Sequence, residues 1–312
     1  MQRVNYILRR ILQMIPVLFV VSLAAFFVIR LVPGDPARLM LGEKATNEAV
    51  AAIRLKLGLD EPLYIQYMKF MQGVFHLDFG NSLKFQRPVI ELIVQRLPVT
   101  LMLTVMSTLF AVIISVPVGY FSGMHKAGVF DRITNVFTLV IIALPTFWVG
   151  LMLLIFFGIY LKILPVGGLG EGVAGYLKSF ILPAFTQSLM TSALLIRNVR
   201  NSVVDIITQD YVDFARSKGV GERDIKYRHI LKNAMISTVT LLSMRMAYML
   251  GGSVIIESVF ALPGLGKLTI DSIYARDYTV VQAVVLIFAV VVMVINLLTD
   301  VLYSILDPRV SY

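Results

Sequence analysis

The chain has 312 residues, of which 58% are hydrophobic and 15% charged, with a formal net charge of +9 and a mean hydropathy of +0.82. Globular domains carry about 25% charged residues, so this composition excludes an ordinary water-soluble domain and indicates an integral membrane protein. There is no cysteine, which excludes disulfides and thiolate metal sites. The three histidines, His76, His125 and His229, fall in separate polar segments, so we expect no metal site.

Six apolar runs have about the 20 helical residues that are needed to cross roughly 30 Å of hydrocarbon. In chain order they are residues 11–32, 98–121, 133–161, 179–196, 234–256 and 280–305. The first run is too long for the apolar part of a signal peptide and is interpreted as a retained span. Pro183 and Gln187 interrupt the fourth run, which is the weakest. The runs predict an all-α protein with six transmembrane helices.

Residues 33–97 separate the first two runs and are too long for a turn. Apolar residues recur there at helical spacing, which favours a structured insertion over a disordered one. Thr46 stands where it would cap a helix that ends before Gly58, and Pro62 stands where a second helix would begin. We therefore expect helices in this insertion.

Lysine and arginine concentrate in three polar segments, which the positive-inside rule assigns to the cytoplasm. They are Arg3, Arg9 and Arg10 at the N-terminus, Lys126 and Arg132 between the second and third runs, and Arg197, Arg200, Arg216, Lys218, Arg223, Lys226, Arg228 and Lys232 between the fourth and fifth. Both termini and the loop 197–233 are then cytoplasmic, and the insertion 33–97 is external. The positive net charge reflects this topology and does not indicate a nucleic acid partner.

The loop 197–233 contains an ordered pattern of apolar residues. A helix over residues 208–219 would place Tyr211, Phe214 and Ala215 on one side, with Lys218 beyond them and Gly219 at its end, where glycine tolerates the left-handed conformation. A loop that only enforces topology would need charge and no such pattern. We therefore favour a helix that docks onto another protein.

The stretch "DFARSKGVGERDIKYRHIL" resembles the EAA loop of binding-protein-dependent ABC importer permeases, which docks into a groove of the cytoplasmic ATPase. The positions of its E-A-A-x-x-x-G pattern hold Asp213, Phe214, Ala215 and Gly219, with aspartate in place of the usual glutamate and phenylalanine in place of the first alanine. The segments "LVPGDPARLMLG", "LGLDEPLYIQY", "ESVFALPGLGKLTIDSI" and "NLLTDVLYSILDPR" resemble the dipeptide, oligopeptide and nickel permease subfamily. The resemblance covers nearly the whole chain.

This resemblance implies one type I importer transmembrane domain over residues 1–312, of the B-type, in a bacterial or archaeal cytoplasmic membrane. It further implies a C-type permease partner, two ATP-binding subunits that hold ATP and Mg, and an extracytoplasmic solute-binding protein, with membrane lipid around the spans. This chain would have no cofactor and no catalytic site of its own. The residues expected to couple it to the ATPase are Tyr211, Asp213, Phe214, Ala215, Arg216, Lys218 and Gly219.

Four polar residues lie inside the predicted spans. A charge at the depth of Arg245 costs about 2.5 to 3.5 kcal/mol on the insertion scale, so this side chain should face the interior of the protein or a water-filled cavity. We assign Arg245 and Gln187 to the translocation path. Asn296 and Asp300 match an N-L-x-x-D motif of the family and are one helical turn apart, so we expect them to pack helices.

The expected solute is a dipeptide or oligopeptide, and a glutathione-like conjugate or a nickel chelate remains an alternative because permeases for all of these share the motifs. An ion-coupled secondary transporter is less favoured, since inverted repeats and paired carboxylates in the spans are not found. A membrane scaffold protein would carry a plain basic loop in place of the ordered helix. An enzyme is disfavoured because no nucleophile, histidine and carboxylate fall together.

Overall fold

The computed structural model describes residues 2–28, 30, 35–41 and 45–306. These residues form helices and connecting loops, with one isolated β-bridge between Asn81 and Pro88 and no named strand among them. Two compact units are found, one of Met1–Val99 with Pro263–Val294 and the other of Thr100–Leu262 with Ile295–Tyr312. Two helices, α5 (Val89–Met124) and α13 (Tyr278–Leu306), continue from one unit into the other.

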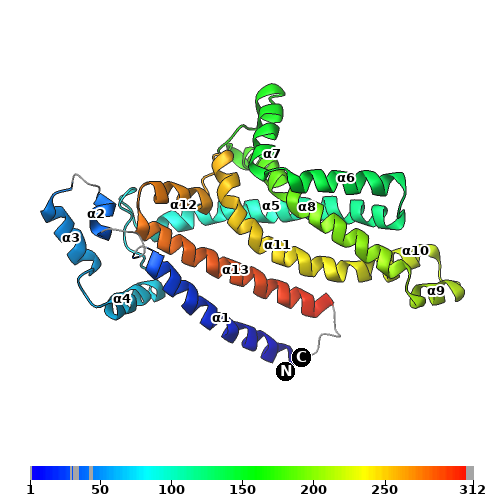
Figure 1. Cartoon of the computed structure of the whole chain (residues 1–312), viewed down its shortest axis with the longest axis horizontal. Coiled ribbons are helices and arrows are strands. Elements are labelled where there is room, and N and C mark those ends of the chain that lie inside the picture. Colours follow the sequence, from blue (N-terminus) through cyan, green and yellow to red (C-terminus); the bar gives the residue numbers. More distant parts are fainter. Residues whose placement is uncertain (1, 29, 31–34, 42–44, 307–312) are drawn as a thin grey trace. The chain divides into compact units, whose positions relative to one another are not determined.

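The first unit contains the insertion. Its further helices are α1 (Gln2–Val28), α2 (Pro36–Leu41), α3 (Asn47–Leu57), α4 (Leu63–Phe75) and α12 (Leu265–Tyr274) (Figure 1). The Thr46 side chain accepts a hydrogen bond from the Ala49 N–H at 3.2 Å, and Gly58 ends α3 with a φ of 61°. Pro62 precedes the first residue of α4. The helices predicted from these residues are confirmed.

Helix α4 is held against α1 by an aromatic and polar contact. The Tyr67 hydroxyl lies 2.7 Å from Ser22 Oγ, and the Tyr67 ring is 5.3 Å from the Phe26 ring in an edge arrangement. Arg30 lies over the same Phe26 ring at 3.5 Å and donates to the Gln66 side chain. The insertion is therefore packed onto the first span through α4.

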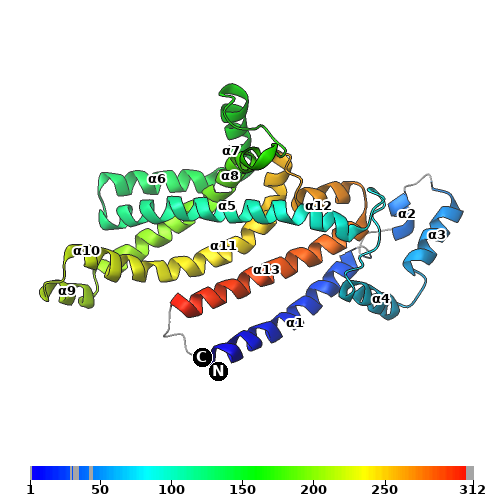
Figure 2. The same cartoon turned by 180° about the vertical axis from the view of Figure 1, so that it is seen from behind.

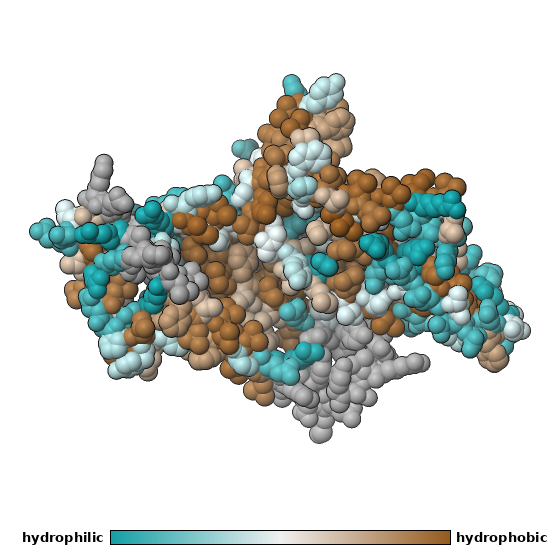
Figure 3. Space-filling model, in the orientation of Figure 1, coloured by the Kyte–Doolittle hydropathy of each residue, from teal (hydrophilic) through white to brown (hydrophobic). Residues whose placement is uncertain are grey.

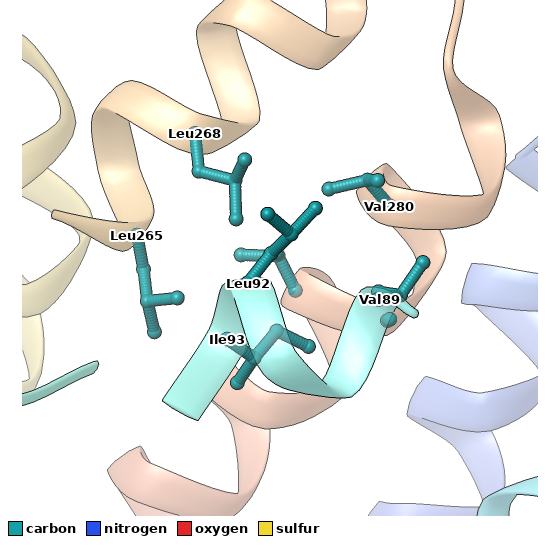
Figure 4. Packing of buried hydrophobic residues seen from close by; sticks show 8 residues of the cluster. Val89, Leu92, Ile93, Leu265, Leu268 and Val280 are labelled. Atoms are coloured by element: carbon teal, nitrogen blue, oxygen red, sulfur yellow. The ribbon is translucent and has the colours of Figure 1, made fainter. Parts of the chain in front are cut away.

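The core of the first unit is formed by the start of α5, by α12 and by the start of α13. Figure 4 shows Leu92 between Leu268 and Val280, with Leu265, Ile93 and Val89 around it. All six side chains are 4% exposed or less. Asp277, which precedes α13, accepts hydrogen bonds from Ser82 Oγ at 2.5 Å and from the Lys84 N–H at 3.1 Å. This contact fixes the segment before α5 to the turn between α12 and α13.

The second unit is built around one long helix. Its elements besides α5 and α13 are α6 (Val129–Ala143), α7 (Thr146–Leu153), the π-helix η1 (Leu154–Tyr160), α8 (Gly172–Ile207), α9 (Asp210–Ser217), α10 (Glu222–Asp224), the π-helix η2 (Ile225–Leu231) and α11 (Lys232–Val259). Helix α8 packs against α6, α7, α11 and η2, and Figures 1 and 2 show α5 and α6 lying side by side and antiparallel to each other. The space-filling view is mostly apolar over α6 and α7 and mostly polar over α9 and α10 (Figure 3).

Five of the predicted spans are found as helices that are long and apolar enough to cross a membrane. The third run, 133–161, was predicted as one helix, and this is wrong: α6 and the segment Thr146–Tyr160 meet at an angle of 101°. The cause is Pro145, which disfavours helical backbone in the residue before it. Leu144 accordingly is extended, with φ −85° and ψ 135°. Counted as one broken span, the pair brings the number to the six predicted.

The fourth run was the weakest in the sequence because its helix is the most enclosed by protein. In α8, 72% of the apolar window is buried inside the chain, whereas the corresponding shares of α5 and α11 are 39% and 28%. Ser, Thr and Gln side chains on α8 are among the buried residues. A helix surrounded by other helices does not need to be apolar toward lipid, which explains its low hydropathy.

Two glycines of α5 set how closely α5 and α8 approach each other. A Cβ on Gly119 would lie 2.7 Å from Val199 Cβ and 2.8 Å from the Ile196 carbonyl oxygen. A Cβ on Gly123 would lie 2.7 Å from Val203 Cβ. The two glycines are four residues apart and form the G-x-x-x-G spacing that lets helix backbones pack closely in membranes.

We expect Gly123→Ala to separate α5 from α8 and to destabilise the protein by about 1–3 kcal/mol, the usual cost of overpacking. The measurement is the thermal unfolding of the purified protein in detergent. Gly252→Ala is the matched control, because a Cβ at this α11 glycine meets nothing within 4 Å. Equal melting temperatures for the two variants would contradict the close contact of α5 with α8.

Candidate functional site

The predicted docking helix is present as α9 (Asp210–Ser217), which is shorter than the expected 208–219. Gly219 follows it with a φ of 74°, in the left-handed region that favours glycine. The Gly219 N–H donates to the Arg216 carbonyl at 2.9 Å, and the Val220 N–H reaches back to Ala215 at 3.2 Å. The predicted role of Gly219 in ending the helix is therefore confirmed.

The inner face of α9 is held by a small apolar cluster, here called the α9 mount. Its buried members are Val199 and Val203 of α8, Val212 and Ala215 of α9, Ile225 and Ile230 of η2, and Ala234 of α11. Tyr120 and Met124 of α5 pack against it. The mount thus joins α9 to the ends of three long helices.

Ala215 was expected on the outer side of α9 with Tyr211 and Phe214, and this is wrong. Ala215 is only 7% exposed and belongs to the α9 mount, three residues from the fully buried Val212. The sequence analysis missed Val212, although its spacing to Ala215 is the helical signal for a shared face.

The outer face of α9 carries two aromatic side chains. Phe214 is 60% exposed and Tyr211 is 41% exposed. The Tyr211 hydroxyl accepts a hydrogen bond from Asn233 Nδ2 at 3.0 Å, which fixes that ring against α11. Phe214 has the Lys218 ammonium 4.5 Å from its ring centre. The result is an exposed apolar ring with a cation at its edge, on a helix whose other face is fully packed.

The charged residues of α9 are paired within the loop. Arg216 lies 3.2 Å from Asp213 and 3.3 Å from Glu222 of α10. Exposed pairs of this kind contribute about 0 to 1 kcal/mol each, so they do not hold the fold. These pairs orient Arg216 between α9 and α10. The Asp213 side chain remains 70% exposed.

A buried ion pair near α9 was not predicted from the sequence. Asp131 at the start of α6 is 3% exposed and accepts two hydrogen bonds from Arg200 of α8, at 3.0 and 2.8 Å. Ser122 Oγ and the Ala127 N–H donate to the same carboxylate at 2.7 and 2.9 Å. The available signal was that Asp131 is the one acidic residue among residues 122–132. This pair locks α6 to α8 at the end of the unit where α9 lies (Figures 1 and 2).

Gln187 was assigned to the translocation path, and its surroundings contradict this. The side chain is 6% exposed, donates to the Met249 carbonyl of α11 at 2.5 Å and accepts from Ser107 of α5 at 3.2 Å. With both ends of the amide bonded to neighbouring helices, Gln187 cross-links α5, α8 and α11. The amide is buried between these helices and is not presented on a surface that a solute could reach.

Of the two residues assigned to helix packing in α13, only the side chain of Asn296 can be compared with that expectation. Asn296 lies on an exposed side of α13, so the expected contact of its side chain with another helix of this chain is not seen. The side chain of Asp300 lies outside the described residues. The packing role of this motif therefore stays a prediction.

Arg245 lies in α11 and is partly buried. Its Nε is buried without a hydrogen-bond partner, and its guanidinium carbon is 5.4 Å from the centre of the Tyr248 ring. Among the described residues no carboxylate lies within ion-pair distance of it. Across the same described part of the chain, no group of three or more His, Cys, Asp or Glu side chains is placed to hold a metal ion.

The chain is similar to known transport proteins along almost its full length. The profile described as "Binding-protein-dependent transport system inner membrane component" matches residues 115–312, and that of the N-terminal part of such membrane components matches residues 3–104. The glutathione transport system permease protein GsiC of Salmonella paratyphi A is 38% identical over 308 residues, which are 99% of each chain. The GsiC protein of Escherichia coli K12 has the same identity and coverage.

A solved structure shows the same fold. The inward-facing MetNI methionine ABC transporter matches with a TM-score of 0.59 and 19% identity, over 70% of this chain and 97% of that chain. At this identity the match shows the fold alone. It confirms the predicted architecture of a type I ABC importer permease.

We expect the α9 mount, and not the exposed ring, to determine whether α9 stays folded. Val212→Ala leaves a cavity in the mount and should cost about 1.5 kcal/mol locally, which raises amide hydrogen exchange of residues 210–217 roughly tenfold. The measurement is hydrogen exchange of the purified permease without its ATPase. Phe214→Ala is the control and should leave the exchange unchanged; faster exchange in Phe214→Ala than in Val212→Ala would contradict this assignment.

Proposed function

Because the chain belongs to the family of binding-protein-dependent transport system inner membrane components, the permeases of ABC importers, we propose that it imports peptides or glutathione-like peptide conjugates. It is a multi-pass protein of the bacterial inner membrane. The choice of solute is supported by the relatives that share 38% of its residues, which are named as glutathione transport permeases. Glutathione is itself a tripeptide derivative, so the two solute classes share their chemistry.

The chain works in a complex. A C-type permease completes the translocation path, an extracytoplasmic binding protein delivers the solute, and two ATP-binding subunits bind ATP and Mg and hydrolyse the nucleotide. The family description supports the binding protein directly, since it names transport that depends on one. In this division of roles the permease provides the path and the mechanical coupling and has no catalytic site.

The orientation that this function requires puts residues 197–233 in the cytoplasm and residues 33–97 outside. The distribution of lysine and arginine supports it, with eight of these residues in the loop 197–233. The insertion 33–97, whose helix α4 packs on α1, then lies on the side where the binding protein arrives.

The single observation that supports coupling through α9 is its division into a packed and an exposed face. Val212 and Ala215 are buried in the α9 mount, while Phe214 on the outer face is 60% exposed. The exposed ring enters a groove of the ATPase, and Asp213, Arg216 and Lys218 around it set the register, as charges at the rim of an interface do. When the ATPase subunits close, they push α9, and the mount transmits the movement to α5, α8 and α11.

The first test of this coupling is truncation of the exposed ring. Phe214→Ala should weaken the association with the ATPase by about 2 kcal/mol, as expected for an aromatic anchor, and should lower ATP-coupled uptake while the binding protein still delivers solute. Phe130→Ala is the matched control, because Phe130 is an exposed phenylalanine (46%) in the first turn of α6 at the same end of the unit. The measurements are co-purification of the ATPase and ATP hydrolysis in proteoliposomes.

Cysteine crosslinking checks the same contact, and the chain has no native cysteine to interfere. A cysteine at Arg216 should crosslink to the ATPase, and one at Lys126 in the turn between α5 and α6 should do so much less. Because the ATPase is cytoplasmic, crosslinking at Arg216 also tests the orientation of the loop. Equal yields at both positions, or normal coupling in Phe214→Ala, would show that α9 does not dock.

The solute class is tested by uptake into proteoliposomes that contain the complete complex. With the cognate binding protein outside, we expect ATP-dependent accumulation of labelled glutathione or of a labelled dipeptide, and no accumulation of a nickel–histidine chelate. The competing solutes are added in excess to rank them. Uptake of the nickel chelate alone would contradict the proposal and favour the chelate importers of the same family.

A further inference from the structure

The exposed residues of α11 follow one continuous stripe. The stripe consists of Asn233, Ser237, Thr240, Met244, Tyr248, Gly251, Ile255 and Ser258, which are separated by three or four positions, and the two other exposed residues of α11, Lys232 and Gly252, each adjoin a member of it. Residues at this spacing lie on one face of a helix. Most of them are polar or small, although the helix is one of the membrane spans.

Other spans expose a different kind of surface. Within residues 101–121 of α5 and 133–143 of α6 every exposed residue is apolar, and these residues include Val105, Leu109, Ile113, Ile133, Val136 and Phe137. Such faces are suited to lipid, whereas hydroxyl groups at membrane depth are costly unless water or protein surrounds them. The α11 stripe is therefore a surface toward water or protein, and the α5 and α6 surfaces are directed to lipid.

Arg245 lies at the edge of this stripe, in the middle of the span. It is eleven residues from each end of the apolar run 234–256, which corresponds to about 16 Å of helix in either direction. Leu241 and Met249, one turn before and after it, pack toward Ala111 and Leu195. Met244 and Tyr248, on the adjoining side, are 59% and 71% exposed. The guanidinium therefore stands between the packed face of α11 and its open face.

The charge of Arg245 is not balanced within the described residues. Its Nε is buried without a hydrogen-bond partner, and the contact given for its guanidinium is the Tyr248 ring at 5.4 Å. The Tyr248 hydroxyl likewise has no hydrogen-bond partner among the described residues. The guanidinium thus lies beside the Tyr248 ring at the centre of a span, and no described residue accepts a hydrogen bond from Arg245 or from the Tyr248 hydroxyl.

We propose that Arg245 and Tyr248 form an anion-selective element in the wall of the translocation path, which favours solutes with a free carboxylate. The proposal rests on the proposed function, since it assigns the solute class of that same path. A carboxylate passing along the stripe accepts hydrogen bonds from the guanidinium, the geometry that arginine recognises best. A neutral or cationic chelate gains nothing from this pair. The alternative role is structural: a carboxylate of the second permease pairs with Arg245, and that subunit covers the exposed face of α11.

Thiol labelling of the assembled complex separates these roles without requiring transport. A single cysteine at Tyr248 or at Ser258 is exposed to an anionic reagent, methanethiosulfonate ethylsulfonate, and to a cationic one, methanethiosulfonate ethyltrimethylammonium. The complex with the unaltered, cysteine-free chain gives the background from the other subunits. Val294, on the exposed apolar surface of α13, provides the lipid-facing control and should react with neither reagent.

We expect the cysteine at position 248 to react and to prefer the anionic reagent, with a smaller preference at position 258, ten residues away. Adding Arg245→Gln should lower the anionic-to-cationic rate ratio at 248 by roughly tenfold, the lower range of electrostatic focusing in a cleft, and Arg245→Lys should retain it. The comparison of positions 248 and 258 is made with Arg245 unchanged. It therefore tests the proposal even if the complex with Arg245→Gln does not assemble.

Two outcomes overturn the proposal. A cysteine at 248 that reacts with neither reagent shows that lipid or the second permease covers the stripe, and equal ratios at 248 and 258 show that Arg245 exerts no selection. Neither result changes the expected uptake of glutathione or of a dipeptide by the unaltered complex, so the proposed function is tested separately. Conversely, anion preference at 248 in a complex that transports neither solute would refute the proposed solutes and would still support an anion-selective role for Arg245.

Discussion

The enclosure of α8 by other helices is the constraint on which the second unit depends. A buried membrane helix is freed from the need to be apolar toward lipid, and α8 uses this freedom to carry groups that bind its neighbours. Gln187 cross-links it to α5 and α11, and Arg200 pairs with Asp131 of α6. Breaking one partner of such a buried pair leaves an uncompensated charge, which is more costly than the pair is worth. The arrangement of the spans around α8 is thus fixed by specific polar contacts as well as by packing.

The same helix positions α9. Val199 and Val203 of α8 face two partners at once, since they contact the glycines of α5 and also belong to the α9 mount. The backbones of α5 and α8 are in close contact at this level, so there is no gap between α5 and α8 that could close when α9 is displaced. The proposed coupling helix is therefore attached to a stiff base, and a push on it acts on the long helices together.

Local signals explain how much of this could be predicted from the sequence. The caps at Thr46 and Gly58 and the left-handed Gly219 depend on the chain nearby, and they were predicted correctly. The break before Pro145 also has a local cause and was overlooked within a strongly apolar run. What the sequence could not show depends on tertiary partners. Gln187 looks like a group for a solute until Ser107 and Met249 are placed beside it, and Ala215 looks like an outward residue until the ends of α5, α8 and η2 surround it.

The glycines of the second unit show why residue type alone does not predict a role. In α5, Gly119 and Gly123 are required by contact, because a Cβ on either would meet α8 at less than 3 Å. In α11, Gly251 and Gly252 meet nothing within 4 Å, so close packing within this chain does not require them. Each glycine in a helix costs about 1 kcal/mol relative to alanine, and here no contact within the described residues offsets that cost.

Gly251 and Gly252 lie one turn beyond Tyr248, and Gly251 belongs to the polar stripe. At this level α11 has no bulk toward the open side, although its other face is held by the hydrogen bond from Gln187 to the Met249 carbonyl. The second unit therefore combines a rigid α5–α8 pair with a helix that leaves space along its exposed face.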